Sequence, residues 1–319
     1  MRTGTCFIAN PNAGSIQLDA IKAWVEANPH AELRETKAQG DGRILAAKAR
    51  EDGFACVVAV GGDGTVTEVV NGLADGPDGV VLGIIPCGTG NDLCRTLGIP
   101  LDPVAALALL EEGEVRKIDL FRATFRGQAP LWGVNMAVGG VAGEIGDRVD
   151  PDAKKRWGPL AFVGESIKVA LEEIPKFDLK ITADGEVIEP GELVAAVVGN
   201  GRTCGGGRHA SPRSNPEDGL LDLVLVQSGS VLDVAGMLAR LVAGDYTRND
   251  LVTHRTAKHL KLESSPPMGF NLDGEFVGTC PVEFEVVPGV LGVIVGPGYN
   301  AVPKPVQREE SSSVITMGT

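Results

Sequence analysis

The sequence predicts a protein of the α/β plus β class: an N-terminal α/β domain with a mainly parallel sheet, followed by an antiparallel β-rich domain. Up to residue 125, short apolar strand patterns alternate with helical patterns, which is the order of a parallel sheet covered by helices. After residue 125, apolar runs are separated by Gly, Asp and Pro turns, which is typical of antiparallel strands. A chain of 319 residues is long enough to form two cores.

The elements of the first domain follow from hydrophobic periodicity. Four short, mostly apolar runs predict strands, and five segments with helical spacing predict helices between and after them. The strands are expected at 5–9, 32–36, 55–60 and 80–85, and the helices near 15–28, 41–52, 63–74, 90–97 and 102–112.

The second domain is expected to contain mainly strands, interrupted by two helices near 159–173 and 231–243. The predicted strands are 131–137, 177–183, 193–198, 221–226, 259–263 and 282–287. We place the domains at 1–125 and 126–290, with 291–305 as a candidate for completing the first domain and 306–319 as a frayed tail.

Composition and charge exclude several classes of function. The formal net charge of −13 argues against binding nucleic acid or an anionic membrane through bulk electrostatics. No run of about 20 apolar residues is present to span a bilayer, and the N-terminus lacks the pattern of a secretion signal. We therefore expect a cytoplasmic protein without a transmembrane segment, whose contact with membranes is local and transient.

A glycine-rich turn connects the predicted strand 55–60 to the following helix. Gly61, Gly62 and Gly64 permit close backbone approach, and the unpaired N–H groups of the helix N-terminus would point back toward this turn. Such donors at the positive end of a helix favour an anion, most simply a phosphate. The turn lacks the third glycine of a dinucleotide fingerprint and the Gly-Lys pair of a P-loop. An ordinary strand-to-helix turn is the alternative interpretation.

Two more polar turns follow neighbouring strands, and in an open α/β sheet all three would line one crevice. Residues 84–92, "IIPCGTGND", repeat the arrangement of strand, glycine turn and helix, and residues 10–14, "NPNAG", follow the first strand. For Asn91 and Asp92, helix capping alone and a role in ligand binding are both open.

Two acidic turns lie in the second domain. Residues 215–223, "NPEDGLLDL", carry carboxylates suited to Mg²⁺, although Asp218-Gly219 is an equally good hairpin signal. In "FNLDGEF", residues 270–276, Asp273 or Glu275 could accept a proton from an attacking hydroxyl, and Asp273-Gly274 is again also a hairpin signal.

Taken in order, the segments "NPNAG", "GGDGTVTEVVNGL", "PCGTGNDLCRTLGI", "GGGRHASPRSNPEDGLLDLVLV" and "FNLDGEF" resemble the diacylglycerol kinase-like lipid kinases, particularly their soluble bacterial branch. The resemblance covers essentially residues 5–300. It implies a nucleotide-binding α/β domain and a β-sandwich-like domain, with ATP and lipid meeting in the cleft between them.

The resemblance also implies roles for individual residues. It makes Glu275 the general base, and Asp273, which spacing alone does not separate from it, stays the second candidate. From the needs of phosphoryl transfer, Asp63 would organise either the loop or a metal-bound water. The resemblance has a further implication for the metal. It places Mg²⁺ at Asn215, Asp218 and Leu220. The implied nucleotide contacts are Asn10, Gly14, Thr36, Gly61, Gly62, Asp63, Gly64, Thr65, Val66, Thr67, Gly88, Thr89 and Asn91.

One position departs from the family pattern. Many relatives carry a basic residue directly after the NPxxG turn, whereas Gly14 is followed here by Ser15-Ile16-Gln17. Phosphate charge must then be neutralised by Mg²⁺, by backbone donors or by a distant arginine such as Arg202 or Arg208. On the lipid side, residues 154–157, "KKRW", are a candidate interfacial contact, with a solvated charged turn as the alternative.

The sequence therefore predicts an ATP- and Mg²⁺-dependent lipid kinase that phosphorylates the hydroxyl of diacylglycerol or a similar lipid at a membrane surface. Kinases for a sphingoid base, ceramide or phosphatidylglycerol are the nearest alternatives, and an NAD kinase is a more distant one. A nucleotide- or lipid-sensing protein without catalytic activity is the alternative of another class. A homodimer is a candidate assembly.

Overall fold

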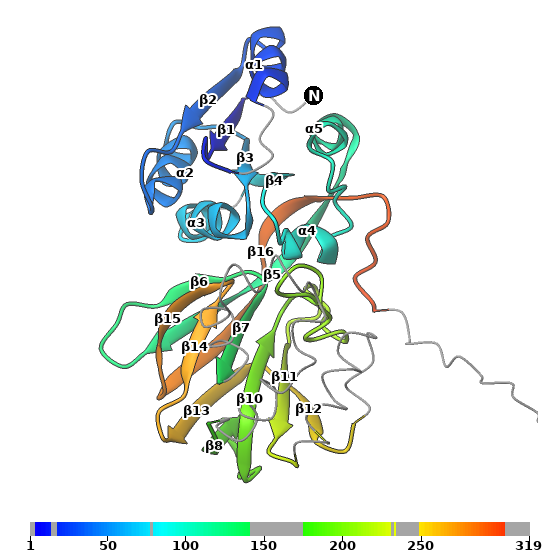
Figure 1. Cartoon of the computed structure of the whole chain (residues 1–319). Helices are drawn as coiled ribbons and strands as arrows, with labels where there is room; N and C mark the ends of the chain where they lie inside the picture. Colours follow the sequence, from blue (N-terminus) through cyan, green and yellow to red (C-terminus); the bar gives the residue numbers. More distant parts are fainter. Residues whose placement is uncertain are drawn as a thin grey trace, which may run out of the picture.

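The computed structural model describes residues 4–13, 18–76, 79–140, 175–230, 233 and 249–303. Gly14, the basic segment 154–157, the predicted helix 159–173 and the tail 306–319 lie outside these residues, as does nearly all of the predicted helix 231–243. Figure 1 shows an α/β body and a β body, joined by two long strands that pass from one to the other.

The α/β body is built on parallel strands in the order β4-β3-β1-β2. Alternate side chains of β3 enter different cores, Val57 and Ala59 on one face and Val58 and Val60 on the other, so the sheet is buried on both sides. The elements are β1 (Thr5–Ala9), α1 (Leu18–Ala27), β2 (Ala31–Glu35), α2 (Asp41–Glu51), β3 (Cys56–Gly61), α3 (Asp63–Leu73), β4 (Val81–Pro86), α4 (Asp92–Thr96) and α5 (Pro103–Glu112).

The β body consists of antiparallel strands around an aromatic core. Phe284 is fully buried, with its ring centroid 6.1 Å from that of Phe121 and 5.6 Å from that of Phe270. The strands are β6 (Leu131–Gly133), β7 (Met136–Gly140), β8 (Phe177–Ala183), β9 (Glu186–Ile188), β10 (Glu192–Gly199), β11 (Leu221–Gln227), β12 (Val252–Ala257), β13 (His259–Ser265), β14 (Gly269–Leu272) and β15 (Glu275–Thr279).

The structure confirms the two-part architecture and most predicted elements, with small shifts at their ends, and corrects three predictions. The strand expected at 131–137 is interrupted at Val134 and Asn135, because these two amides turn toward a buried carboxylate instead of a neighbouring strand. The strand expected at 282–287 continues to Val295 as β16 (Val282–Val295). Several strands were not predicted: β9, β12, β14 and β15 of the β body, and β5 (Glu114–Phe125), whose first half is rich in charged residues.

β5 and β16 connect the two bodies. In the β body, β16 pairs with β13, and in the α/β body its final residues pair with β4 in parallel. β5 accompanies β16 through both bodies, with a break in register between Val287 and Leu291. The described strands therefore form one continuous 16-stranded sheet, with a β-bulge where the two bodies meet.

Asp119 holds this bulge in place. The break in register leaves residues 288–290 of β16 opposite Asp119 of β5. The Asp119 carboxylate accepts hydrogen bonds from the amides of Gly289 (2.8 Å) and Gly219 (2.7 Å), and its own amide donates to the carbonyl of Pro216 (2.7 Å). Burial raises the pKa of Asp119. One side chain thus fixes the bulge and the acidic turn that precedes β11.

We predict that Asp119→Ala lowers the free energy of unfolding by about 3 kcal/mol, because two amides lose a charged acceptor inside the protein. Urea denaturation followed by circular dichroism measures the loss. Asp178→Ala on β8 is the matched control, since Asp178 is exposed, and it should change stability little. Equal stabilities of the two variants would contradict the role given to Asp119.

Candidate functional site

A pocket of about 270 Å³ lies where residues of both bodies meet. The turn after β1, the segment after β2, the start of α3 and the turn between β14 and β15 all contribute to its wall. It is lined by Asn10, Asn12, Thr36, Lys37, Ala38, Gln39, Gly64, Thr65, Glu68 and Glu275. The structure therefore gathers five residues that the sequence predicted for the site, Asn10, Thr36, Gly64, Thr65 and Glu275.

The predicted glycine turns pack backbone against backbone beside this pocket. A Cβ atom on Gly88 would lie 2.5 Å from the Cα atom of Gly62, so glycine is required for this approach. Gly62 is the N-cap of α3 and offers no side chain to the first-turn amides, while Gly64 and Thr65 in that turn line the pocket. The N-terminus of α3 thus faces the pocket as an anion-binding arrangement.

Not every predicted nucleotide residue lines the pocket. The side chain of Val66 is buried in the core of the α/β body, and the hydroxyl of Thr67 donates to Asp273 Oδ2 at 3.3 Å. Asn91 has a left-handed backbone (φ 51°), and its side chain pairs with both the amide and the carbonyl of Gly88. Asn91 does occupy the N-cap position of α4, but its side chain braces the glycine turn and caps no amide of the helix.

Asp63 and Asp92 join the glycine turn that precedes α3 to the glycine turn that precedes α4, and they join both turns to the β body. Asp63 Oδ1 accepts a hydrogen bond from the amide of Asp92 (2.8 Å), and burial, followed by the charge of Asp92, raises the pKa of Asp63. The buried carboxylate of Asp92 in turn accepts from the amides of Gly206 (3.0 Å) and Gly207 (2.7 Å).

The triglycine loop can surround Asp92 because Gly205, Gly206 and Gly207 all adopt positive φ angles, at 60°, 86° and 96°. The carbonyl of Asp92 also accepts the hydroxyl of Thr203 at 2.9 Å. From the sequence, helix capping and ligand binding were both open for Asp92, and in the structure its carboxylate links the two bodies. The run of three glycines was the available signal, because such a run can wrap an anionic side chain.

The two acids of the 270–276 segment lie in different environments. The buried carboxylate of Asp273 accepts hydrogen bonds from the amides of Val134, Asn135 and Met136 at 2.8–3.0 Å, and burial raises its pKa to about 6. Asp273 and Gly274 have φ angles of 49° and 99° in a two-residue hairpin, as the alternative interpretation predicted.

Glu275, two residues further on, is exposed and lines the pocket. Its Oε1 atom lies 3.5 Å from Nε2 of Gln39, which belongs to the α/β body. Its carboxylate is therefore accessible to a ligand in the pocket, whereas that of Asp273 is already surrounded by donors.

Comparison with known proteins agrees with this arrangement. Residues 5–123 match the diacylglycerol kinase catalytic domain, and residues 135–295 match the YegS C-terminal NAD kinase beta sandwich-like domain. A protein of Pseudomonas aeruginosa strain UCBPP-PA14 named "Probable lipid kinase YegS-like" is 35% identical over 91% of this chain and 93% of its own. The chain belongs to the diacylglycerol kinase-like family of lipid kinases.

More distant relatives cover almost the same length. A protein named diacylglycerol kinase from Staphylococcus aureus strain bovine RF122 is 29% identical over 89% of this chain and 90% of its own. The crystal structure of a diacylglycerol kinase from Bacillus anthracis matches with a TM-score of 0.72 and 28% identity, covering 94% of this chain and 99% of that one. An NAD kinase from Archaeoglobus fulgidus, with a TM-score of 0.52 and 12% identity over 92% of this chain and 94% of its own, shares the fold.

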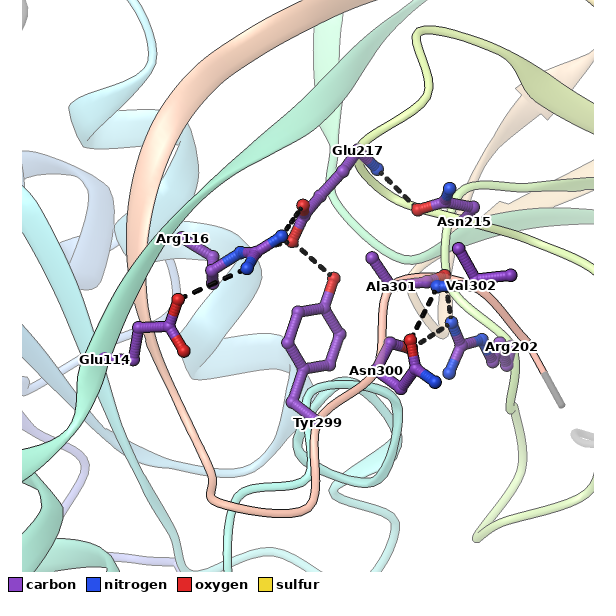
Figure 2. A network of polar contacts seen from close by, with 9 residues as sticks. All are labelled: Glu114, Arg116, Arg202, Asn215, Glu217, Tyr299, Asn300, Ala301 and Val302. Carbon is purple, nitrogen blue, oxygen red and sulfur yellow. Dashed lines mark hydrogen bonds and ion pairs between the residues drawn. The ribbon is translucent and has the colours of Figure 1, made fainter.

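The acidic turn of this lipid kinase lies apart from the pocket. Asn215 Oδ1 accepts the amide of Glu217, and Asp218 Oδ1 accepts the amide of Leu220. The side chain of Glu217 is held by Arg116, at 2.5 and 3.1 Å, and by the hydroxyl of Tyr299, at 2.9 Å (Figure 2). Because this turn leads from a long loop into β11, the hairpin interpretation of Asp218-Gly219 is wrong.

The donor set of this turn fits a hard cation. Burial raises the pKa of Asp218, and the charges of Asp222 and Asp119 raise it further, so a cation beside it would relieve repulsion among carboxylates. Glu217, Asp218 and Gly219 line a second pocket, which does not include Glu275. Among the described residues, no group of three or more His, Cys, Asp or Glu side chains is arranged as a metal site.

The two arginines considered for phosphate binding are engaged elsewhere. Arg202 donates to the carbonyls of Ser214, Asn300 and Ala301, and Figure 2 shows its contact with the last two. Arg208 donates to the carbonyl of Gly205.

Within the part of the chain that the structure describes, no helix has both the length and the apolar character needed to span a membrane.

We predict that Asp92→Asn loosens the triglycine loop, because an amide group replaces one of the two acceptor oxygens with a donor. Amide hydrogen exchange at Gly206 and Gly207 should become roughly tenfold faster, as expected for the loss of about one hydrogen bond. Asp102→Asn is the matched control, since Asn caps α5 about as well as Asp. Unchanged exchange in Asp92→Asn would show that the loop is held by other contacts.

Proposed function

We propose that this lipid kinase transfers the γ-phosphoryl group of ATP to the hydroxyl of diacylglycerol or a similar lipid, in a Mg²⁺-dependent reaction that gives phosphatidic acid or the equivalent phospholipid. The observation that carries the proposal is that Glu275 of the β body lines the same pocket as the N-terminus of α3. An acceptor for a proton and a binding arrangement for phosphate thus face one space, as phosphoryl transfer requires.

The nucleotide is proposed to bind along the turns of the α/β body. The amides at the start of α3 would donate hydrogen bonds to the phosphates. The carboxylate of Asp63, through its hydrogen bond with the amide of Asp92, links this turn to the one at residues 88–91. Asn10 and Thr36 line the same pocket after β1 and β2. The other proposed nucleotide contacts are Gly61, Gly62, Val66, Thr67, Gly88, Thr89 and Asn91, which do not line the pocket, and Gly14, which lies outside the described residues.

Glu275 is proposed as the general base. Its carboxylate accepts the proton of the lipid hydroxyl while that oxygen forms a bond to the γ-phosphorus and the bond to the bridging oxygen of ADP breaks. The hydrogen-bond partners of the two acids support Glu275 over Asp273 as the base. Three backbone amides and the Thr67 hydroxyl occupy the oxygens of Asp273, which positions the hairpin that carries Glu275.

Magnesium is proposed in two places. One ion accompanies the nucleotide phosphates, since Mg²⁺ commonly binds through substrate phosphates and few protein ligands. A second is assigned to Asn215, Asp218 and Leu220, where side-chain and backbone oxygens would hold it. There it would neutralise the carboxylates gathered beside the bulge of β16.

The proposal is tested by following labelled γ-phosphate from ATP, with and without Mg²⁺. The acceptor panel contains mixed micelles of diacylglycerol, sphingosine, ceramide and phosphatidylglycerol, with NAD as the water-soluble control. Labelled phosphatidic acid supports the proposal, and a different labelled lipid assigns a different acceptor. Labelled NADP, or ATP binding without any labelled product, contradicts it. Because such a lipid resides in a bilayer, the proposal includes transient contact of a cytoplasmic enzyme with the membrane surface.

We predict that Glu275→Gln lowers turnover by about 10²-fold or more, which is the scale of losing a general base. The fold and the affinity for ATP should change little, because this side chain is exposed and its hydrogen bond with Gln39 is long. Steady-state kinetics and calorimetric titration with ATP measure the two effects. Glu186→Gln on β9 is the control, and turnover in Glu275→Gln equal to that of this control would remove Glu275 from the role.

We predict that Asp218→Asn weakens the response of the protein to Mg²⁺, because it removes the charged ligand of the turn. The rise in melting temperature on adding MgCl₂ should be smaller than in the wild type, since a ligand stabilises only the state that binds it. The measurement is thermal unfolding across a Mg²⁺ titration. Asp250→Asn is the control for the loss of one carboxylate, and superimposable titrations of all three proteins would reject the metal assignment.

A further inference from the structure

The pocket shared by both bodies contains an uneven set of charges. Among the described residues that line it, the carboxylates are Glu68 and Glu275, and the single cation is Lys37. Residues 14–17, which the structure does not describe, contain no charged side chain. A polyphosphate placed in this pocket needs a positive charge nearby, since ionic contacts are stronger where water is partly excluded.

Lys37 belongs to a short strap, residues 36–40, that connects β2 to α2 along the pocket wall. The amide of Thr36 donates to the carbonyl of Ala9, which aligns the strap with the end of β1. Lys37 therefore follows directly after a residue whose position is fixed by the sheet.

The backbone of the strap is engaged by two carboxylates. Asp41 Oδ2 accepts the amides of Lys37 (2.7 Å) and Ala38 (2.9 Å), and these bonds, together with the charge of Lys37, lower the pKa of Asp41. The carboxylate of Glu68 accepts the amides of Gly40 (2.7 Å) and Gly42 (2.8 Å) at the start of α2. Four backbone amides of the strap and of the first turn of α2 are thus unavailable to a phosphate. The strap can therefore donate a hydrogen bond to a phosphate mainly through a side chain.

The charge of Glu68 is also compensated by the same contact. Its two oxygens lie at the N-terminus of α2, where the helix dipole and two amides favour a negative charge. Glu68 therefore needs no lysine as a partner, and the ammonium group of Lys37 stays available to a ligand.

We propose that Lys37 is a phosphate-binding residue of this lipid kinase and binds the polyphosphate of the nucleotide in the pocket that it lines together with the N-terminus of α3. The inference rests on the proposed nucleotide site and assigns its missing cation. Arg202 and Arg208 do not take this part, because their guanidinium groups bind backbone carbonyls outside the pocket.

The experiment compares ATP and adenosine binding to the full chain by calorimetric titration with MgCl₂ in excess. Lys37→Gln should weaken ATP binding on the order of tenfold, the scale of one charge-assisted hydrogen bond, and leave adenosine binding unchanged. Lys37→Arg should retain most of the affinity for ATP. Lys48→Gln is the matched control, because Lys48 lies on the neighbouring helix α2 and pairs with Asp52 at the surface.

The outcomes separate this inference from the kinase proposal. Equal affinity of Lys37→Gln and wild type for ATP overturns the inference and leaves the kinase proposal standing. An equal loss for ATP and adenosine also overturns it, since a disturbed strap would act on both ligands. Lys37-dependent ATP binding without phosphorylation of any lipid supports the inference and contradicts the kinase proposal. A wild type that binds no ATP overturns both.

Discussion

Carboxylates that accept hydrogen bonds from backbone amides hold the irregular segments of this lipid kinase in place. Asp119 binds the bulge of β16, Asp92 binds the triglycine loop, and Asp273 binds the break between β6 and β7. Each contact joins segments distant in the sequence. A charged acceptor suits this task, because irregular backbone inside a protein leaves amides without a ladder partner, and each unpaired donor is costly.

The same contacts explain why the buried acids differ from the exposed acid in what their oxygen atoms can still bind. A carboxylate surrounded by amides is oriented and desolvated, and it has little remaining capacity to accept another proton donor. Asp273 and Asp92 are in this state, whereas among the described residues Glu275 forms only the long hydrogen bond with Gln39. The catalytic proposal therefore follows from the availability of oxygen atoms, since the two acids of "FNLDGEF" cannot be distinguished by spacing.

The sequence was sufficient to predict those parts of the structure that depend on neighbouring residues in the chain. Periodicity predicted the strands of the parallel sheet, and the glycine turns and the Asp273-Gly274 hairpin follow from backbone conformations that few other residues adopt. It failed where a distant partner decides the outcome. The interruption at Val134 depends on a carboxylate 139 positions later, and the course of β5 depends on pairing with β16 near the end of the chain. Those partners are visible only once the chain has folded.

The contacts between the bodies also differ in strength, and this constrains how a substrate can enter. The contacts of Asp92 and Asp119 are buried and short, so displacing them would leave amides unpaired. The contact between Gln39 and Glu275 is exposed and 3.5 Å long, and it borders the pocket directly. A ligand that takes the place of Gln39 therefore disturbs little else. The hairpin anchored by Asp273 keeps Glu275 in position, so the Glu275 carboxylate can exchange its partner while its backbone stays fixed.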